Sequence, residues 1–183
     1  MKFSPTTIAG VHVIELERRS DDRGFFARQW CGEEMRRAGL DPRLAQINTA
    51  RSTASGTLRG VHFQRQPHAE VKLVRCTRGA VFDVAVDLRA DSPTFRQWFG
   101  IELDEETGRM LYIPEGCGHG YLTLAPDTEL VYQASVPYAP QSAIGVRHDD
   151  PAFKITWPGK INVISQQDRN WPAFIAAPGA AGP

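Results

Sequence analysis

Histidine is the side chain best suited to proton transfer near neutral pH, and two of the five histidines lie in a recognisable pattern. His119 follows two glycines and a proline at fixed offsets, in Gly108-x5-Pro114-x-Gly116-x2-His119. His62 begins the triplet His62-Phe63-Gln64, and Glu70 and Lys72 follow it. Two imidazoles and a carboxylate indicate either a metal site or a metal-free site for acid–base chemistry.

Both patterns resemble the paired motifs of the cupin superfamily. The first motif corresponds to Gly56-x5-His62-x-Gln64 with Glu70 and Gly79, and the second runs through His119. The resemblance implies that each motif is a strand–turn–strand unit that projects ligands into a double-stranded β-helix.

The first motif is altered at the positions that would hold a metal. A metal cupin supplies an HxH pair, a glutamate and the histidine of the second motif, whereas here the second histidine of the pair is Gln64 and Glu70 falls two positions late. A facial triad of two histidines and one carboxylate stays open. Lys72 would place an ammonium group beside the cation, which is costly where the dielectric is low. The sequence therefore favours a site without a metal ion.

The elements that would position these residues are short strands. Turn signals such as Asp21-Asp22-Arg23-Gly24 recur along the chain, separated by runs rich in β-branched and aromatic residues. The expected strands are 11–16, 72–76, 80–88, 98–103, 110–113, 120–124 and 130–135. Within 82–88, apolar residues alternate with small or acidic ones, which is typical of a half-buried strand. Only 32–40 favours a helix.

These signals predict an all-β fold, a cupin-type double-stranded β-helix or jelly-roll barrel with a few short helices. Without a repeat or a linker, residues 1–183 are expected to form one domain, and 173–183, rich in Ala, Gly and Pro, a flexible tail.

Composition excludes several classes of partner. Of 183 residues 42% are hydrophobic, and 21 Lys and Arg balance 21 Asp and Glu, so neither a nucleic acid nor a membrane is expected to bind. No apolar run approaches the roughly 20 residues of a membrane span, and the N-terminus lacks a signal-peptide core, so a cytoplasmic protein is expected. The three cysteines form no CxxC pair, and Cys117 is interpreted as a packed thiol rather than a nucleophile.

Seven blocks in fixed order carry a closer resemblance. They are residues 22–26 (DRGFF), 58–64 (LRGVHFQ), 72–75 (KLVR), 81–89 (VFDVAVDLR), 92–95 (SPTF), 113–116 (IPEG) and 119–120 (HG). Together they are similar to the dTDP-4-dehydrorhamnose 3,5-epimerases, over about residues 5 to 172.

The resemblance implies an isomerase that inverts C3 and C5 of a dTDP-4-keto-6-deoxyhexose, converting dTDP-4-dehydro-6-deoxyglucose to dTDP-4-dehydro-L-rhamnose without a cofactor. A base must remove the proton next to the C4 ketone, a cation must hold the enolate oxygen, and an acid must protonate the opposite face. The resemblance assigns the base to His62, oriented by Asp168, and the acid to Tyr132, a phenol with a pKa of about 10. Lys72 and Arg59 would contact the enolate and sugar oxygens, and His119 the sugar.

For the nucleotide half, the resemblance implies contacts from residues of several segments, some of them from a neighbouring subunit. These are Arg23, Phe25, Gln46, Asn48, Arg59 and Tyr138. Guanidinium groups suit phosphates because their forked donors bind two oxygens at once. A homodimer that exchanges N-terminal strands and shares its active sites is also implied.

The chain departs from the family around the rim of the implied site. Glu70 and Val71 precede Lys72 where Gln-Gly or Gln-Ala is common, and a carboxylate there would pair with the lysine. The other departures are Arg28, Met110 and Pro137. They leave open a 3- or 5-monoepimerase of a related dTDP-deoxysugar, a metal-dependent cupin, and a non-catalytic cupin that binds sugar nucleotides.

Overall fold

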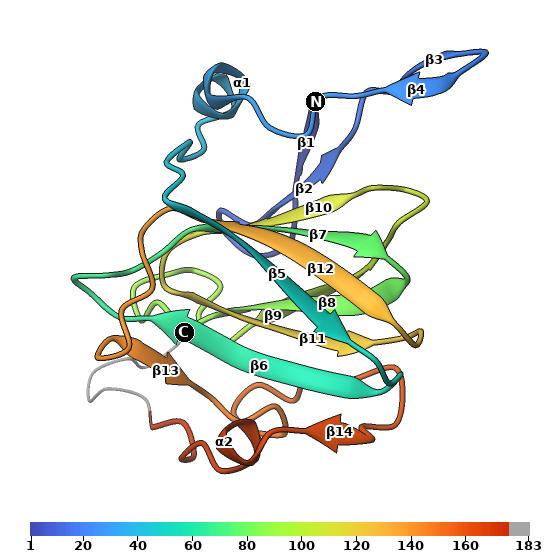
Figure 1. Cartoon of the computed structure of the whole chain (residues 1–183). Helices are drawn as coiled ribbons and strands as arrows, with labels where there is room; N and C mark the ends of the chain where they lie inside the picture. The colour runs from blue at the N-terminus through green and yellow to red at the C-terminus, as the bar shows by residue number, and fades with distance from the viewer. Residues whose placement is uncertain (176–183) are drawn as a thin grey trace.

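Two β-sheets lie face to face in a computed structural model that describes residues 1–175 (Figure 1). The first sheet has the order β1 (Lys2–Pro5), β2 (His12–Glu15), β10 (Met110–Ile113), β7 (Lys72–Arg78), β12 (Thr128–Ala134) and β5 (Gln46–Ser52). The second has the order β13 (Ala143–Gly145), β6 (Thr57–Gln64), β11 (Cys117–Thr123), β8 (Ala80–Asp87) and β9 (Trp98–Asp104), and β14 (Val163–Ile164) pairs in parallel with β6.

The smaller elements lie at the two ends of this sandwich. Strands β3 (Arg19–Asp21) and β4 (Gly24–Phe26) form a hairpin that extends away from both sheets, and α1 (Gly32–Arg37) lies at the same end of the molecule (Figure 1). At the opposite end, α2 (Gln166–Arg169) and β14 lie beside β6. Within residues 1–175, neither helix has the length and apolar character that a bilayer span requires.

Apolar side chains from both sheets interdigitate to form the main core. Val74, Leu111 and Leu130 of the first sheet pack against Ala85 and Leu103 of the second, and all five are at most 1% exposed. Burial of this kind stabilises the fold by about 25 cal/mol per Å² of apolar surface. The core is thus the layer between the sheets, as expected for a sandwich.

Strand β8 corrects one sequence interpretation. Its alternation predicts a strand with one solvent-facing side, yet Asp83 and Asp87 are fully buried. The other side of the strand is covered as well, because Val84 and Val86 pack in a second apolar cluster with Val146 and other residues of the 146–157 segment. The half-buried expectation for 82–88 is therefore wrong, although the strand itself is confirmed.

The predicted fold class is confirmed, with one refinement. Apart from the β3–β4 hairpin, the described strands form two separate sheets rather than one closed barrel, so the jelly roll is a flattened, cupin-type sandwich. The predicted helix at 32–40 is shorter than expected and spans Gly32–Arg37. Most of the predicted tail at 173–183 lies outside the described residues.

Candidate active site

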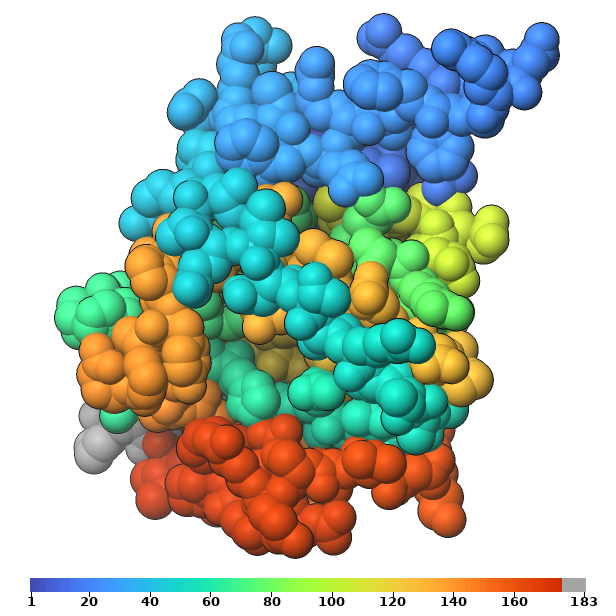
Figure 2. Space-filling view, in the orientation of Figure 1, coloured from blue at the N-terminus to red at the C-terminus, as the bar shows by residue number. Residues whose placement is uncertain are grey.

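A cavity opens at the edge of the sandwich, where β5 and β12 of the first sheet face β6 of the second. Figure 2 shows the hollow between the β5 segment and the C-terminal segment that carries α2. It has an outer lobe of about 440 Å³, which Gln46 and Tyr138 help to line, and an inner lobe of about 530 Å³, which Arg59 and His119 help to line. Both volumes are within the usual range for small-molecule sites. Four residues line both lobes, namely His62, Lys72, Tyr132 and Gln167.

His62 on β6 is paired with a buried carboxylate. Its Nε2 is hydrogen-bonded to Oδ1 of Asp168, whose side chain is 5% exposed while that of His62 is 45% exposed. Asp168 lies in the first turn of α2, where its backbone N–H donates to the capping Oγ of Ser165 at 3.0 Å. With Nε2–H donating to the carboxylate, a neutral imidazole keeps its lone pair on Nδ1, so it can accept a proton there.

Hydrogen bonds from neighbouring residues keep the Asp168 carboxyl ionised. Burial alone would raise the pKa of this carboxyl, but hydrogen bonds from His62, the Gly60 N–H and Ser165 outweigh burial and hold the pKa below its ordinary value. Trp171 Nε1 also donates to Asp168 Oδ1, at 3.3 Å. Asp168 is therefore anionic across the neutral range, and it stabilises the imidazolium that forms when His62 takes up a proton.

Gly60 explains how β6 brings His62 to this position. Its φ is +105°, and a Cβ at this residue would lie 2.5 Å from the carbonyl oxygen of His119 on β11. Only glycine permits both the conformation and the close approach of the two strands. The same residue donates its N–H to Asp168 Oδ2 at 3.3 Å, so one glycine fixes both members of the pair.

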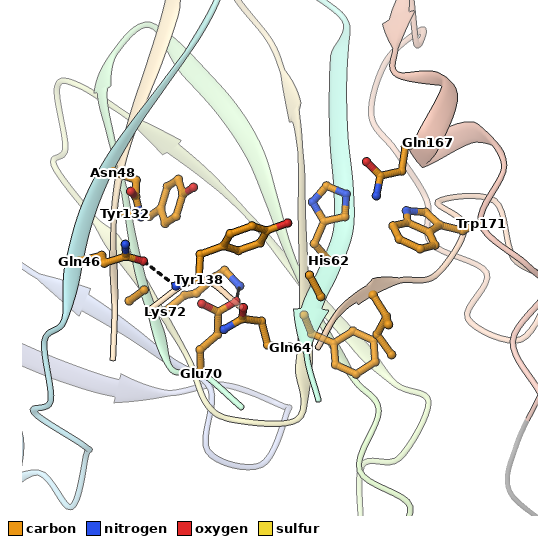
Figure 3. A pocket seen from close by; sticks show the side chains of 14 residues that line it. Gln46, Asn48, His62, Gln64, Glu70, Lys72, Tyr132, Tyr138, Gln167 and Trp171 are labelled. Atoms are coloured by element: carbon orange, nitrogen blue, oxygen red, sulfur yellow. Dashed lines mark hydrogen bonds and ion pairs between the residues drawn. The ribbon is translucent and has the colours of Figure 1, made fainter. Parts of the chain in front are cut away.

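Tyr132 comes from β12, on the wall opposite His62 (Figure 3). Burial raises the pKa of its phenol, and the negative charge of Glu70 raises it further, whereas Arg59 lowers it. The phenol therefore stays protonated at neutral pH and can act as a proton donor.

Lys72 begins β7 and forms an ion pair with Glu70 inside the cavity (Figure 3). The two side chains are only 12% and 10% exposed. An ammonium group at this depth is suited to stabilise an oxyanion that develops between the His62 and Tyr132 walls.

His119 lines the inner lobe and is held by Asp83 of β8. The Nε2–Oδ1 distance is 2.7 Å, and Asp83 is fully buried. Tyr121 lines the same lobe, and burial raises the pKa of its hydroxyl to about 12. Its oxygen and Asp83 Oδ2 are buried without a hydrogen-bond partner among the described residues, so this lobe has unused polar groups close to His119.

The outer lobe is framed by a loop that two glutamines hold. Gln46 Oε1 accepts from the Tyr138 N–H at 2.8 Å, and Gln64 Oε1 accepts from the Ala139 N–H at 2.6 Å. Gln64 Nε2 donates to the carbonyls of His68 and Pro137. Tyr138 is 65% exposed at the mouth.

The amide of Gln64 is thus engaged through both its oxygen and its nitrogen, at the position where a metal cupin has a histidine ligand. In the part of the chain that the structure describes, His, Cys, Asp and Glu side chains form no group of three that could hold a metal ion.

Nine of the eleven site residues predicted from the sequence line the two lobes. They are His62, Asp168, Lys72, Tyr132, Gln46, Asn48, Arg59, His119 and Tyr138. Arg23 and Phe25 do not; they lie on the β3–β4 hairpin, where Arg23 pairs with Asp21 and the Arg18 guanidinium lies over the Phe25 ring. Sequence reasoning missed Gln167 and Trp171, which carry no motif and reach the site only because α2 docks on β6.

Comparison with known proteins agrees with this geometry. Residues 5–175 match the family model for dTDP-4-dehydrorhamnose 3,5-epimerase. A dTDP-4-dehydrorhamnose 3,5-epimerase of Sinorhizobium fredii is 41% identical over 179 residues, which are 97% of this chain and 92% of that protein.

Two solved structures have the same fold. The dTDP-4-dehydrorhamnose 3,5-epimerase of Bacillus anthracis with TDP and PPi bound superposes with a TM-score of 0.91 at 36% identity, covering 94% of this chain and 99% of that one. A 3'-monoepimerase of Streptomyces bikiniensis in complex with dTDP-quinovose superposes with a TM-score of 0.86 at 38% identity, covering 93% and 86%.

The fold and these similarities define a cupin-type isomerase. More specifically, the chain belongs to the dTDP-4-dehydrorhamnose 3,5-epimerase family.

Proposed function

We propose that this enzyme inverts C3 and C5 of a dTDP-4-keto-6-deoxyhexose, converting dTDP-4-dehydro-6-deoxyglucose to dTDP-4-dehydro-L-rhamnose. The observation that carries the proposal is the placement of the His62–Asp168 pair and Tyr132 on opposite walls of one cavity, with Lys72 lining both lobes. Inversion at carbon requires a base and an acid on opposite faces, and this arrangement supplies both.

In the proposed mechanism, His62 Nδ1 removes the proton next to the C4 ketone. The C–H electron pair moves into the ring as an enolate, and its oxygen is stabilised by the Lys72 ammonium with help from Arg59. Tyr132 then donates its hydroxyl proton to the carbon from the other side. The phenolate regains a proton from solvent and the imidazolium releases one, so the enzyme returns to its starting state.

The outer lobe is proposed to hold the dTDP half. Gln46 and Asn48 have amide N–H groups that suit phosphate oxygens, and Tyr138 at the mouth offers an aromatic surface for the base. Support comes from the relatives that were solved with TDP and with dTDP-quinovose.

We further propose that the protein is a single-domain homodimer with shared sites. Arg23 lies on a hairpin that extends away from its own sheets, and the adjacent Phe25 and Phe26 are 52% and 70% exposed. A hairpin with two exposed aromatic residues is suited to dock on a second copy, where Arg23 would reach the diphosphate.

The deciding experiment is solvent deuterium incorporation into dTDP-4-keto-6-deoxyglucose, followed by proton NMR. We expect two enzyme-dependent deuterons, at C3 and C5. His62→Ala should abolish both, whereas Tyr132→Phe should impair protonation of the opposite face and leave more of the exchange. Full activity of His62→Ala would disprove the assignment of the base.

A monoepimerase is the second candidate, favoured by the similarity to the 3'-monoepimerase. It predicts one deuteron in the same experiment. A non-catalytic binding protein predicts none, even when the nucleotide binds. A metal-dependent cupin would lose exchange on treatment with a chelator; our proposal expects exchange to persist.

A further inference from the structure

Glu70 is an acidic residue inside the cavity that the proposed reaction does not use. Its carboxylate forms an ion pair with Lys72 and is 10% exposed, and both side chains line the outer lobe. A carboxylate beside a site where an oxyanion develops is unfavourable by itself. Its position therefore calls for a role.

The backbone holds the two charged residues on one face. Val71, between them, donates its N–H to Ser135 Oγ at 2.8 Å and accepts the Ser135 N–H at 3.1 Å through its carbonyl. Its side chain is buried in the apolar cluster with Leu73 and Tyr112. Because side chains alternate along an extended chain, Glu70 and Lys72 both point into the cavity.

We infer that Glu70 is a positioning residue, which holds the Lys72 ammonium at the place where the enolate oxygen is stabilised. This inference rests on the proposed function. A free lysine side chain samples many rotamers, whereas one held by a buried carboxylate presents its remaining N–H donors in a fixed direction. The pair also keeps the local charge near neutral before substrate enters.

The negative charge of Glu70 has a second effect, on the acid. Tyr132 is surrounded by Glu70, Arg59 and Tyr138, with His62 and Lys72 on the walls of the same cavity. After burial, Glu70 is the largest influence that raises the pKa of the phenol. Activity that needs the protonated phenol falls as the pH rises through this pKa, so loss of the Glu70 charge should move that fall to lower pH.

Two substitutions separate the hydrogen bond from the charge. Glu70→Ala removes both and should lower kcat for deuterium exchange by about tenfold or more, with KM within about twofold, because a preorganised donor is lost. Glu70→Gln keeps an oxygen that can accept from Lys72, so it should recover most of kcat. As the pH is raised, its activity should nevertheless begin to fall at a lower pH than that of the wild type. The control is Glu102→Gln, on an exposed position of β9, which should match the wild type throughout.

The outcomes are distinguishable. If the wild type exchanges deuterium but Glu70→Gln keeps its alkaline limb and Glu70→Ala keeps its kcat, the inference about Glu70 is wrong and the proposed function stands. An increase in KM alone would also overturn it, since Glu70 would then be a binding residue. Absence of exchange in the wild type would instead reject the proposed function. Should Glu70→Ala fail to fold, Glu70→Leu, which keeps the bulk of the side chain but offers no acceptor to Lys72, tests the same loss of kcat.

Discussion

At the scale of single residues, the site depends on contacts that set protonation and orientation. His62 is half exposed and would rotate freely if Asp168 did not hold its Nε2. Asp168 in turn accepts from Gly60 and Trp171, so the carboxylate has little freedom of its own. The Gly60 backbone thus orients the Asp168 carboxylate, and the carboxylate in turn orients the His62 imidazole.

Asp168→Asn should therefore lower kcat for deuterium exchange by about 100-fold or more, because an amide neither stabilises the imidazolium nor enforces the same tautomer. KM should change little, since the Asp168 side chain is only 5% exposed and is already engaged by His62, Gly60 and Trp171. Trp171→Phe is the matched comparison: it removes one donor to Asp168, keeps an aromatic ring and should cost much less. Equal losses in the two variants would show that packing, not charge, is what Asp168 contributes. Steady-state exchange kinetics measures both.

Sequence motifs predict those site residues whose partners are close in the sequence or that are part of a known pattern. His62, Lys72 and His119 lie in such patterns. The pairing of His119 with Asp83 was not foreseen, because register across β8 and β11 brings them together. Trp171 belongs to no motif, and nothing in the sequence around it indicates its contact with Asp168.

At the scale of elements, the loop after β12 is held in place by a side chain from β6, a strand of the other sheet. Gln64 ends β6, and its side chain holds the backbone of Pro137 and Ala139 on either side of Tyr138. The first cupin-like motif identifies Gln64 only as the position where the histidine ligand of a metal cupin is absent. Its contacts with the loop, at Pro137 and Ala139, lie more than 70 positions away, and neither composition nor periodicity could reveal them.

Gln64→Ala should loosen this loop and raise KM for the dTDP-sugar about three- to tenfold, the loss expected from roughly one or two hydrogen bonds. The exchange rate at saturation should stay within about twofold, since Gln64 makes no contact with His62, Lys72 or Tyr132 in the hydrogen-bond network. Gln97→Ala, at an exposed position next to β9, is the control. A fall in kcat with unchanged KM would contradict this assignment. Calorimetric titration with dTDP gives an independent reading of affinity.

At the scale of the whole molecule, the fold of one chain brings together nine of the eleven predicted site residues but not Arg23 and Phe25. The two sheets, the cavity and the position of α2 follow from residues that pack within one chain. The β3–β4 hairpin has few such contacts and leads away from the sandwich (Figure 1). For the same reason, β3 and β4 are difficult to predict from the sequence, because few residues of this chain pack against them.

A mixing experiment tests the proposed sharing of sites. Arg23→Ala and His62→Ala should each be nearly inactive alone. In a hybrid dimer one site would combine the intact His62 of one subunit with the intact Arg23 of the other. Random co-assembly of the two variants should therefore restore about one quarter of wild-type activity, since half of the dimers are hybrids with one working site. If the mixture has only the near-zero activity expected from the sum of the two variants, the sites are not shared, provided that light scattering shows a dimer.

The contact between β6 and the C-terminal segment has a consequence for how the enzyme matures. His62 is made early, but its carboxylate partner comes more than a hundred residues later, on a segment that joins β6 through the Val163–Thr57 pairing and fits Trp171 against Gly145. During synthesis, a nascent chain carries the histidine long before it carries a working base. In the proposed mechanism, proton abstraction therefore requires that this last part of the sandwich has docked, so catalytic activity would itself report completed folding.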